Sequence, residues 1–180
     1  MTKDIFIREL IVRLARLNAS QTWHDDLNPA QVSALKYLSR ANRFSRSPSH
    51  VADYLGTTRG TMSQTLKALD RKGYVSENRS ETDKRSISYD LTQEGTRAAL
   101  HPAALDPMLS DLPEDEQKSL EQTLTNTLIS LLKKNGSKAF GVCKTCRHHQ
   151  QKQNMPYCNL LQLPLEPVEA DQICHEQVPA

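Results

Sequence analysis

The sequence predicts a mainly helical fold with one small β-hairpin and a separate cysteine-rich tail. Only 6 of the 180 residues are glycine, which argues against a chain rich in strands and turns. Apolar residues recur at helical spacing through several segments before residue 135, and all four cysteines follow residue 142. We therefore predict two parts, a helical domain at residues 1–136 and a tail at residues 137–180.

Residues 4–18 are predicted to form the first helix. Their apolar positions follow helical spacing and make a face wider than one neighbouring element would cover. We therefore expect this helix to pack against a second copy of the chain. The apolar residues concerned are Ile5, Phe6, Ile7, Leu10, Ile11, Val12, Leu14 and Leu17.

Three more helices are predicted before residue 74. Asn28 and Pro29 have the types typical of an N-cap and a first helical residue, so a second helix follows them. A short helix begins at Pro48 and ends at Gly56. After one tight turn, a longer helix begins after Thr57 or Thr58 and ends at Gly73.

The last of these helices has two different faces. At 100° per residue, Met62, Leu66 and Leu69 share its inner face. The outer face is polar, hydrogen-bonding and basic, and it carries Ser63, Gln64, Lys67 and Arg71.

The period of the sequence changes after Gly73. YVSENR and RSISYDLT alternate as two strands do, and SETDK between them has the composition of a loop. Two further helices are predicted at about residues 93–110 and 114–134. The tail has no predicted regular structure.

A short helix, a turn, a helix with a polar outer face and a hairpin, in that order, describe a winged helix-turn-helix. The run from LNPAQVSALKYL to LTQEG also resembles the MarR family of transcriptional regulators, over about residues 4–134. The wing and its exit carry the most specific part of the resemblance. The ordered set there is Arg79, Asp83, Arg85, Leu91, Thr92 and Gly95.

The resemblance implies a homodimer on double-stranded DNA with a palindromic operator. Its first and last long helices would interleave, two recognition helices would enter successive major grooves, and two wings would meet the flanking minor grooves. The side chains expected at the DNA are Thr58, Arg59, Thr61, Ser63, Gln64, Lys67, Arg79, Asp83, Lys84 and Arg85.

The charge pattern agrees with this interpretation. Lys and Arg outnumber Asp and Glu between residues 36 and 90, and acidic residues outnumber basic ones between residues 91 and 136. No apolar run is long enough for a membrane span, so we expect a cytoplasmic protein with no membrane partner. No catalytic motif is present outside the cysteines, so we expect no enzyme; whether a small-molecule effector binds stays open.

Cys143, Cys146, Cys158 and Cys174 have the spacing C-x2-C-x11-C-x15-C. A C-x2-C pair can bind one metal centre, and two later cysteines can complete the ligation. Structural zinc in all-cysteine sites usually has two C-x2-C pairs, whereas one pair followed by two single cysteines is similar to high-potential iron–sulfur proteins. The spacing therefore favours an iron–sulfur cluster over zinc, and both remain candidates.

These features predict a sequence-specific DNA-binding regulator, a repressor, whose metal centre senses redox or metal status or stabilises the tail. Loss of a cluster would act through the dimer helices to which the tail is attached after Lys134. Two alternatives remain: an electron-transfer or thiol-redox protein with the helix-turn-helix as scaffold, and a non-specific architectural DNA binder.

Overall fold

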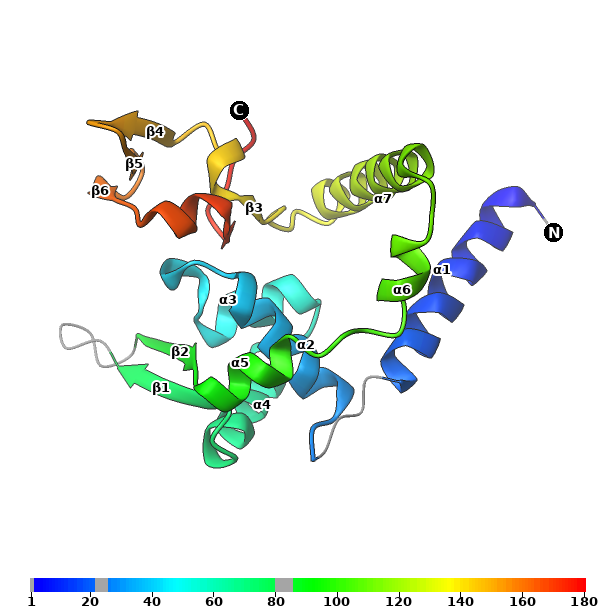
Figure 1. Cartoon of the computed structure of the whole chain (residues 1–180), viewed down its shortest axis with the longest axis horizontal. Coiled ribbons are helices and arrows are strands. Elements are labelled where there is room, and N and C mark those ends of the chain that lie inside the picture. The colour runs from blue at the N-terminus through cyan, green and yellow to red at the C-terminus, as the bar shows by residue number, and fades with distance from the viewer. Residues whose placement is uncertain (1, 22–25, 80–85) are drawn as a thin grey trace.

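The computed structural model of the chain describes residues 2–21, 26–79 and 86–180. Its first part is helical with one hairpin, as expected (Figure 1). The helices are α1 Lys3–Ser20, α2 Pro29–Arg40, α3 Pro48–Leu55, α4 Arg59–Arg71, α5 Gln93–Ala99, α6 Asp106–Ser110 and α7 Glu114–Lys134; a short 3-10 turn, η1, spans Arg43–Ser45; and the hairpin strands are β1 Val75–Arg79 and β2 Ile87–Leu91.

Capping side chains begin the central helices where the sequence placed them. Asn28 Oδ1 accepts from Gln31 N at 3.0 Å, and Asn28 N donates back to Gln31 Oε1 at 3.1 Å, which is a complete capping box. Ser47 caps α3 by accepting from His50 N. Gly56 ends α3 in the left-handed region with φ 65°, which favours glycine, and so permits the tight turn into α4.

The core lies where α2, α3, α4 and α5 meet the hairpin. Met62, Leu66 and Leu69 are buried there, which confirms the predicted inner face of α4. Tyr37 and Tyr89 are the largest fully buried side chains. This packing leaves the opposite side of α4 open to solvent.

The hairpin is antiparallel, with Val75 opposite Leu91 and Arg79 opposite Ile87. It returns directly into α5, where Thr92 caps the helix by accepting from Gly95 N at 3.1 Å. A Cβ at Gly95 would lie 1.9 Å from Tyr74 O, so only glycine fits this position. The threonine and glycine of LTQEG therefore close the wing onto the helix that follows.

The single helix expected at residues 93–110 is wrong, because the structure has two helices there, α5 and α6. Pro102 explains the break: a proline disfavours the helical conformation of the residue before it, His101, and cannot donate a backbone hydrogen bond itself. The long C-terminal helix begins and ends as predicted, at Glu114 and Lys134.

Helices α1 and α7 stand apart from the core (Figure 1). Neither contains a buried residue. Large apolar side chains on both helices are between 37% and 56% exposed: Ile5, Phe6, Ile7, Leu10, Ile11, Val12, Leu14 and Leu17 on α1, and Leu120, Leu124, Leu128, Ile129 and Leu131 on α7. The described chain therefore leaves two apolar helix faces without cover.

The tail contains regular structure, which contradicts the expectation of none. Its strands have only two to four residues each, which is too short to show a period in the sequence. The strands are β3 Gly141–Val142, β4 His149–Lys152, β5 Met155–Cys158, β6 Leu163–Pro164 and β7 Ile173–Cys174; two 3-10 turns are η2 Cys143–Thr145 and η3 Pro167–Asp171. Strand β3 pairs with β7, and β4, β5 and β6 form a second sheet.

The tail packs on the helical part. Phe140 and Ile173 lie against its core, and the Phe140 ring meets the Tyr54 and Tyr37 rings edge-on at 5.4 and 6.3 Å. The boundary between residues 136 and 137 stays a prediction. Across residues 2–21, 26–79 and 86–180, no helix is both long and apolar enough to cross a membrane.

Candidate nucleic-acid interface

The outer face of α4 presents polar and basic side chains to solvent. Gln64 and Lys67 are exposed, and Ser63 beside them is half-buried. Arg59 and Thr61 are exposed at the start of the helix. Since the inner face is fixed by the core, these side chains stand on a rigid helix of a width that fits a major groove.

Thr58 has a structural role at the start of α4. Its Oγ1 accepts from Thr61 N at 3.1 Å and lies 2.8 Å from Thr61 Oγ1. The Thr58 side chain thus supplies a hydrogen-bond acceptor for one of the first N–H groups of the helix, which have no partner within the helix. The two threonine hydroxyls remain exposed and can also meet a phosphate.

The wing is tied to the helix-turn-helix by polar contacts. Glu77 N donates to Asp70 Oδ1 of α4 at 3.2 Å. The Glu77 carboxylate accepts from the Tyr89 hydroxyl at 2.7 Å and from Arg79 Nε at 2.8 Å. These two donors lower the pKa of Glu77, Tyr89 first, so the carboxylate is ionised and holds Arg79 on the exposed strand.

Arg79 is the only expected wing contact that falls within the described residues. Asp83, Lys84 and Arg85 lie outside them. The interface that the structure brings together consists of the outer face of α4, its capped N-terminus and the described base of the wing.

A winged helix-turn-helix with a solvent-facing basic recognition helix is the fold of a class of DNA-binding modules. The family model described as MarR family matches residues 25–86, about a third of the chain. Residues 25–86 are therefore similar to the MarR family, and the match covers α2, α3, α4 and the first strand of the wing.

Solved structures of MepR from Staphylococcus aureus have a similar fold. The crystal structure of the MepR–DNA complex is 22% identical, covers 73% of this chain and 99% of that chain, and has a TM-score of 0.58. MepR in its DNA-binding conformation has the same identity and coverage with a TM-score of 0.59. A further structure, 21% identical with a TM-score of 0.53, is of MepR as a transcription regulator of the multidrug efflux pump MepA. No curated protein matches the chain.

The four cysteines of the tail are free thiols. Cys143, Cys146 and Cys174 are buried, and half-buried Cys158 packs against the apolar cluster of Cys143, Leu165 and Cys174. Backbone turns bring the C-x2-C pair together, since Cys146 N donates to Cys143 O at 3.0 Å. We call these four residues the thiol cluster.

Burial and the neighbouring thiols raise the pKa of Cys143 to about 12. Burial is the first cause of that rise, and Cys174, Cys158 and Cys146 add to it. Burial also raises the pKa of Cys174, against N–H groups of Glu176 and Asn42 that favour its thiolate. Val178 N donates to Cys146 Sγ at 3.5 Å.

The donor chemistry of the thiol cluster therefore fits a metal centre, because backbone N–H groups already point at two of the sulfurs. Within the described ranges, however, no group of three or more His, Cys, Asp or Glu side chains is arranged to hold a metal ion. All four cysteines are free thiols in this structure.

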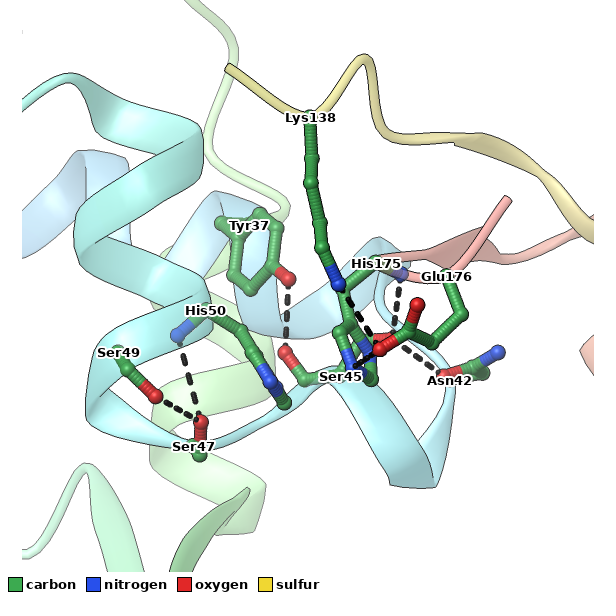
Figure 2. Close-up of polar contacts among 9 residues, drawn as sticks. All are labelled: Tyr37, Asn42, Ser45, Ser47, Ser49, His50, Lys138, His175 and Glu176. Carbon is green, nitrogen blue, oxygen red and sulfur yellow. Dashed lines mark hydrogen bonds and ion pairs between the residues drawn. The ribbon is translucent and has the colours of Figure 1, made fainter. Parts of the chain in front are cut away.

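Sequence reasoning missed a second polar cluster, at the corner between α2 and α3 (Figure 2). Asn42 and Ser45 are 1% and 0% exposed. The His50 ring stacks on the His175 ring with centroids 3.5 Å apart. The one signal available in the sequence was that His175 directly follows Cys174.

Proposed function

We propose that this protein is a dimeric, sequence-specific DNA-binding transcriptional repressor whose tail carries a cysteine-ligated metal centre. The observation that carries the DNA-binding function is the outer face of α4, which is polar, basic and exposed on a winged helix. The contacts would come from Thr58, Arg59, Thr61, Ser63, Gln64, Lys67 and Arg79, together with Asp83, Lys84 and Arg85 of the wing.

Each side chain on α4 has a chemistry suited to one kind of contact. Gln64 carries both a donor and an acceptor, so it can read a base edge in the major groove. Lys67 and Arg59 carry positive charge without an acceptor, which suits phosphates. Base reading and phosphate binding are therefore carried by different residues of one helix.

The uncovered apolar faces of α1 and α7 support a homodimer. Helices with no buried residue gain little stability alone, because helical stability in proteins comes mostly from packing of an apolar face. A second copy of the chain offers the same two faces. A two-fold dimer would present two α4 helices and would bind a palindromic operator.

Repression would follow from occupancy, since a dimer bound across promoter DNA excludes other proteins from it. The likeness to MepR, solved with DNA and described as a transcription regulator, supports the same class of function.

Four-cysteine ligation is the proposed role of the thiol cluster, with an iron–sulfur cluster favoured by the sequence spacing and zinc as the other candidate. The centre would supply metal–thiolate bonds, for which Cys143, Cys146, Cys158 and Cys174 would each release a proton. The high pKa of Cys143 makes it a weak nucleophile at neutral pH. This observation disfavours thiol-redox catalysis at Cys143.

Footprinting tests the DNA-binding proposal. Duplexes that the full-length protein recovers from a random-sequence pool would be mapped by hydroxyl-radical protection. We expect a two-fold symmetric footprint with half-sites about one helical turn apart. Recovery of unrelated sequences with no common footprint would instead indicate the architectural alternative.

A further inference from the structure

One of the contacts between the tail and the helix-turn-helix is made by Ile173–Glu176, which comprises strand β7 and the two residues after it. Asn42 N donates to Ile173 O at 3.0 Å, and Ala41 bridges to Ile173 as a parallel β-pair. This backbone pairing continues the β3–β7 sheet onto the residues that follow α2. We call residues 41–46 the corner.

Side chains strengthen the same contact (Figure 2). The buried hydroxyl of Ser45 accepts from His175 N at 3.0 Å and lies 2.7 Å from Asn42 Oδ1, to which it donates. The Asn42 side chain in turn hydrogen-bonds Cys174, a member of the thiol cluster. A cysteine of the cluster and two fully buried side chains of the corner thus share one hydrogen-bond network.

The corner fixes the start of α3. The Ser45 carbonyl accepts from the Tyr37 hydroxyl at 2.7 Å, which ties it to α2. Two residues later Ser47 caps α3, and His50 in its first turn stacks on His175. Movement of the tail strand would therefore act on the first helix of the helix-turn-helix.

The corner also fixes the wing. Arg46 Nη1 donates to Asp90 Oδ1 of β2 at 2.6 Å, and Tyr89 N donates to Arg46 O at 3.1 Å. Asp90 in turn accepts from Asn78 of β1 at 2.7 Å. One short segment therefore lies between the thiol cluster and two elements, the first helix of the helix-turn-helix and the wing.

We propose that Ile173–Glu176 is a latch through which the state of the thiol cluster sets DNA affinity. When the cluster is intact, the latch is seated on Asn42 and Ser45 and holds the helix-turn-helix and wing in the geometry seen here. When the cluster is broken, the latch loosens and DNA binding weakens. This inference rests on the proposed DNA-binding function, and it places the coupling at the corner instead of in the dimer helices after Lys134.

A double-mutant cycle on the full-length chain tests the latch. Cys158→Ser changes the thiol cluster at a residue on β5, outside the latch, and Ser45→Ala removes the hydroxyl that accepts the hydrogen bond from His175 N. The probe is the duplex that the wild-type protein recovers from a random pool. We expect Cys158→Ser to weaken binding by about fivefold or more in the wild-type background and by less than about twofold in the Ser45→Ala background.

Ser33→Ala is the matched control, since Ser33 is an exposed serine of α2, the helix before the corner, and its hydroxyl donates to Pro29 O. Cys158→Ser should keep its full effect in that background. A full effect in the Ser45→Ala background too, or no effect in any background, would overturn the latch.

Amide hydrogen exchange provides a readout that needs neither the Ser45 variant nor DNA. In Cys158→Ser, the N–H of Asn42, bonded to the latch, and that of Val51, in the first turn of α3, should exchange faster than in wild type. Unchanged exchange at both would contradict the proposal. If the wild-type protein recovers no duplex from the random pool, the proposed DNA-binding function is refuted. The hydrogen-exchange result would then decide by itself whether the latch responds to the thiol cluster.

Discussion

At the scale of single residues, the outer face of α4 separates two kinds of DNA contact. Gln64 and Lys67 are both exposed and three positions apart, so they point from neighbouring turns of one helix face. An amide can discriminate between base edges, whereas an ammonium group responds mainly to phosphate charge. Truncation of Gln64 and truncation of Lys67 should therefore have different effects on DNA binding.

Gln64→Ala should relax sequence preference, at a cost of about 1–3 kcal/mol on the preferred duplex and little on random DNA. Lys67→Ala should weaken binding to all duplexes and lower the slope of log affinity against log salt by about 1 for each protomer. Fluorescence anisotropy over a salt series measures both. Equal losses on random DNA from the two substitutions would refute this division.

His50 gives the fold an acid-sensitive residue. Burial is the main reason that its pKa falls from 6.5 to about 4, with His175 and Lys138 adding to the shift and Asp53 and Glu176 opposing it. The folded state therefore keeps His50 neutral while the unfolded state gains a proton below pH 6.5. Stability from this residue is complete above pH 6.5 and is lost as the pH falls from 6.5 toward 4.

Urea unfolding at pH 7.5 and pH 5 measures this effect. His50→Gln should reduce the loss of unfolding free energy between the two pH values by about 1 kcal/mol, allowing for the partial exposure of the ring. His101→Gln, at an exposed histidine, is the control and should leave the loss as it is in wild type. An identical pH dependence for wild type and His50→Gln would exclude His50 as the source.

At the scale of elements, α1 and α7 are helices whose apolar faces the described chain does not cover. Their exposed side chains repeat every three or four residues, so each helix offers a continuous stripe. The stripe on α1 is predicted to be the larger part of the dimer interface, since eight of its residues are large, apolar and at least 37% exposed.

Leu14→Glu, in the middle of the α1 stripe, should convert the dimer into a monomer, because it would bury a charge in an apolar interface. A chain that starts at Asn18 should also be monomeric. Arg13→Glu, at the neighbouring exposed residue, is the control and should remain dimeric. Sedimentation velocity distinguishes these states, and a stable, folded monomer of the full-length wild type would end the dimer proposal.

The elements also show what sequence alone could supply. Caps, terminators and periodic apolar faces are local signals, so Asn28, Gly56 and the inner face of α4 were predictable. The break at Pro102 was also local and was missed. The contacts of Asn42 with Ile173 and of Ser45 with His175 join positions about 130 residues apart, and no local period encodes them.

At the scale of the whole molecule, the tail has little apolar core of its own. Its buried cluster consists of Cys143, Leu165 and Cys174, with Phe44, Cys158 and Leu163 packed against it. A segment with so little burial needs another source of stability, and metal ligation can supply about 10 kcal/mol or more in the case of structural zinc. The contact of Ile173–Glu176 with the corner is a second constraint on the tail.

Cys146→Ser and Cys158→Ser should each abolish stoichiometric metal and loosen residues 138–180, while the winged helix stays folded because no cysteine lies before residue 143. Ser137→Ala, just before the loosened segment, should keep its metal. Elemental analysis and the absorption spectrum of anaerobically purified protein identify the centre, and a brown solution indicates iron–sulfur. Neither iron nor zinc near one centre per chain, together with four titratable thiols, would exclude the metal proposal.

The central claim is that the α4 face reads DNA sequence. The measurement that tests it most directly is the ratio of affinities, at one fixed physiological salt concentration, for the duplex recovered from a random pool and for a scrambled duplex of equal length. The account predicts a preference of about 1,000-fold or more, which falls in the range of specific regulators. A ratio near one would contradict it.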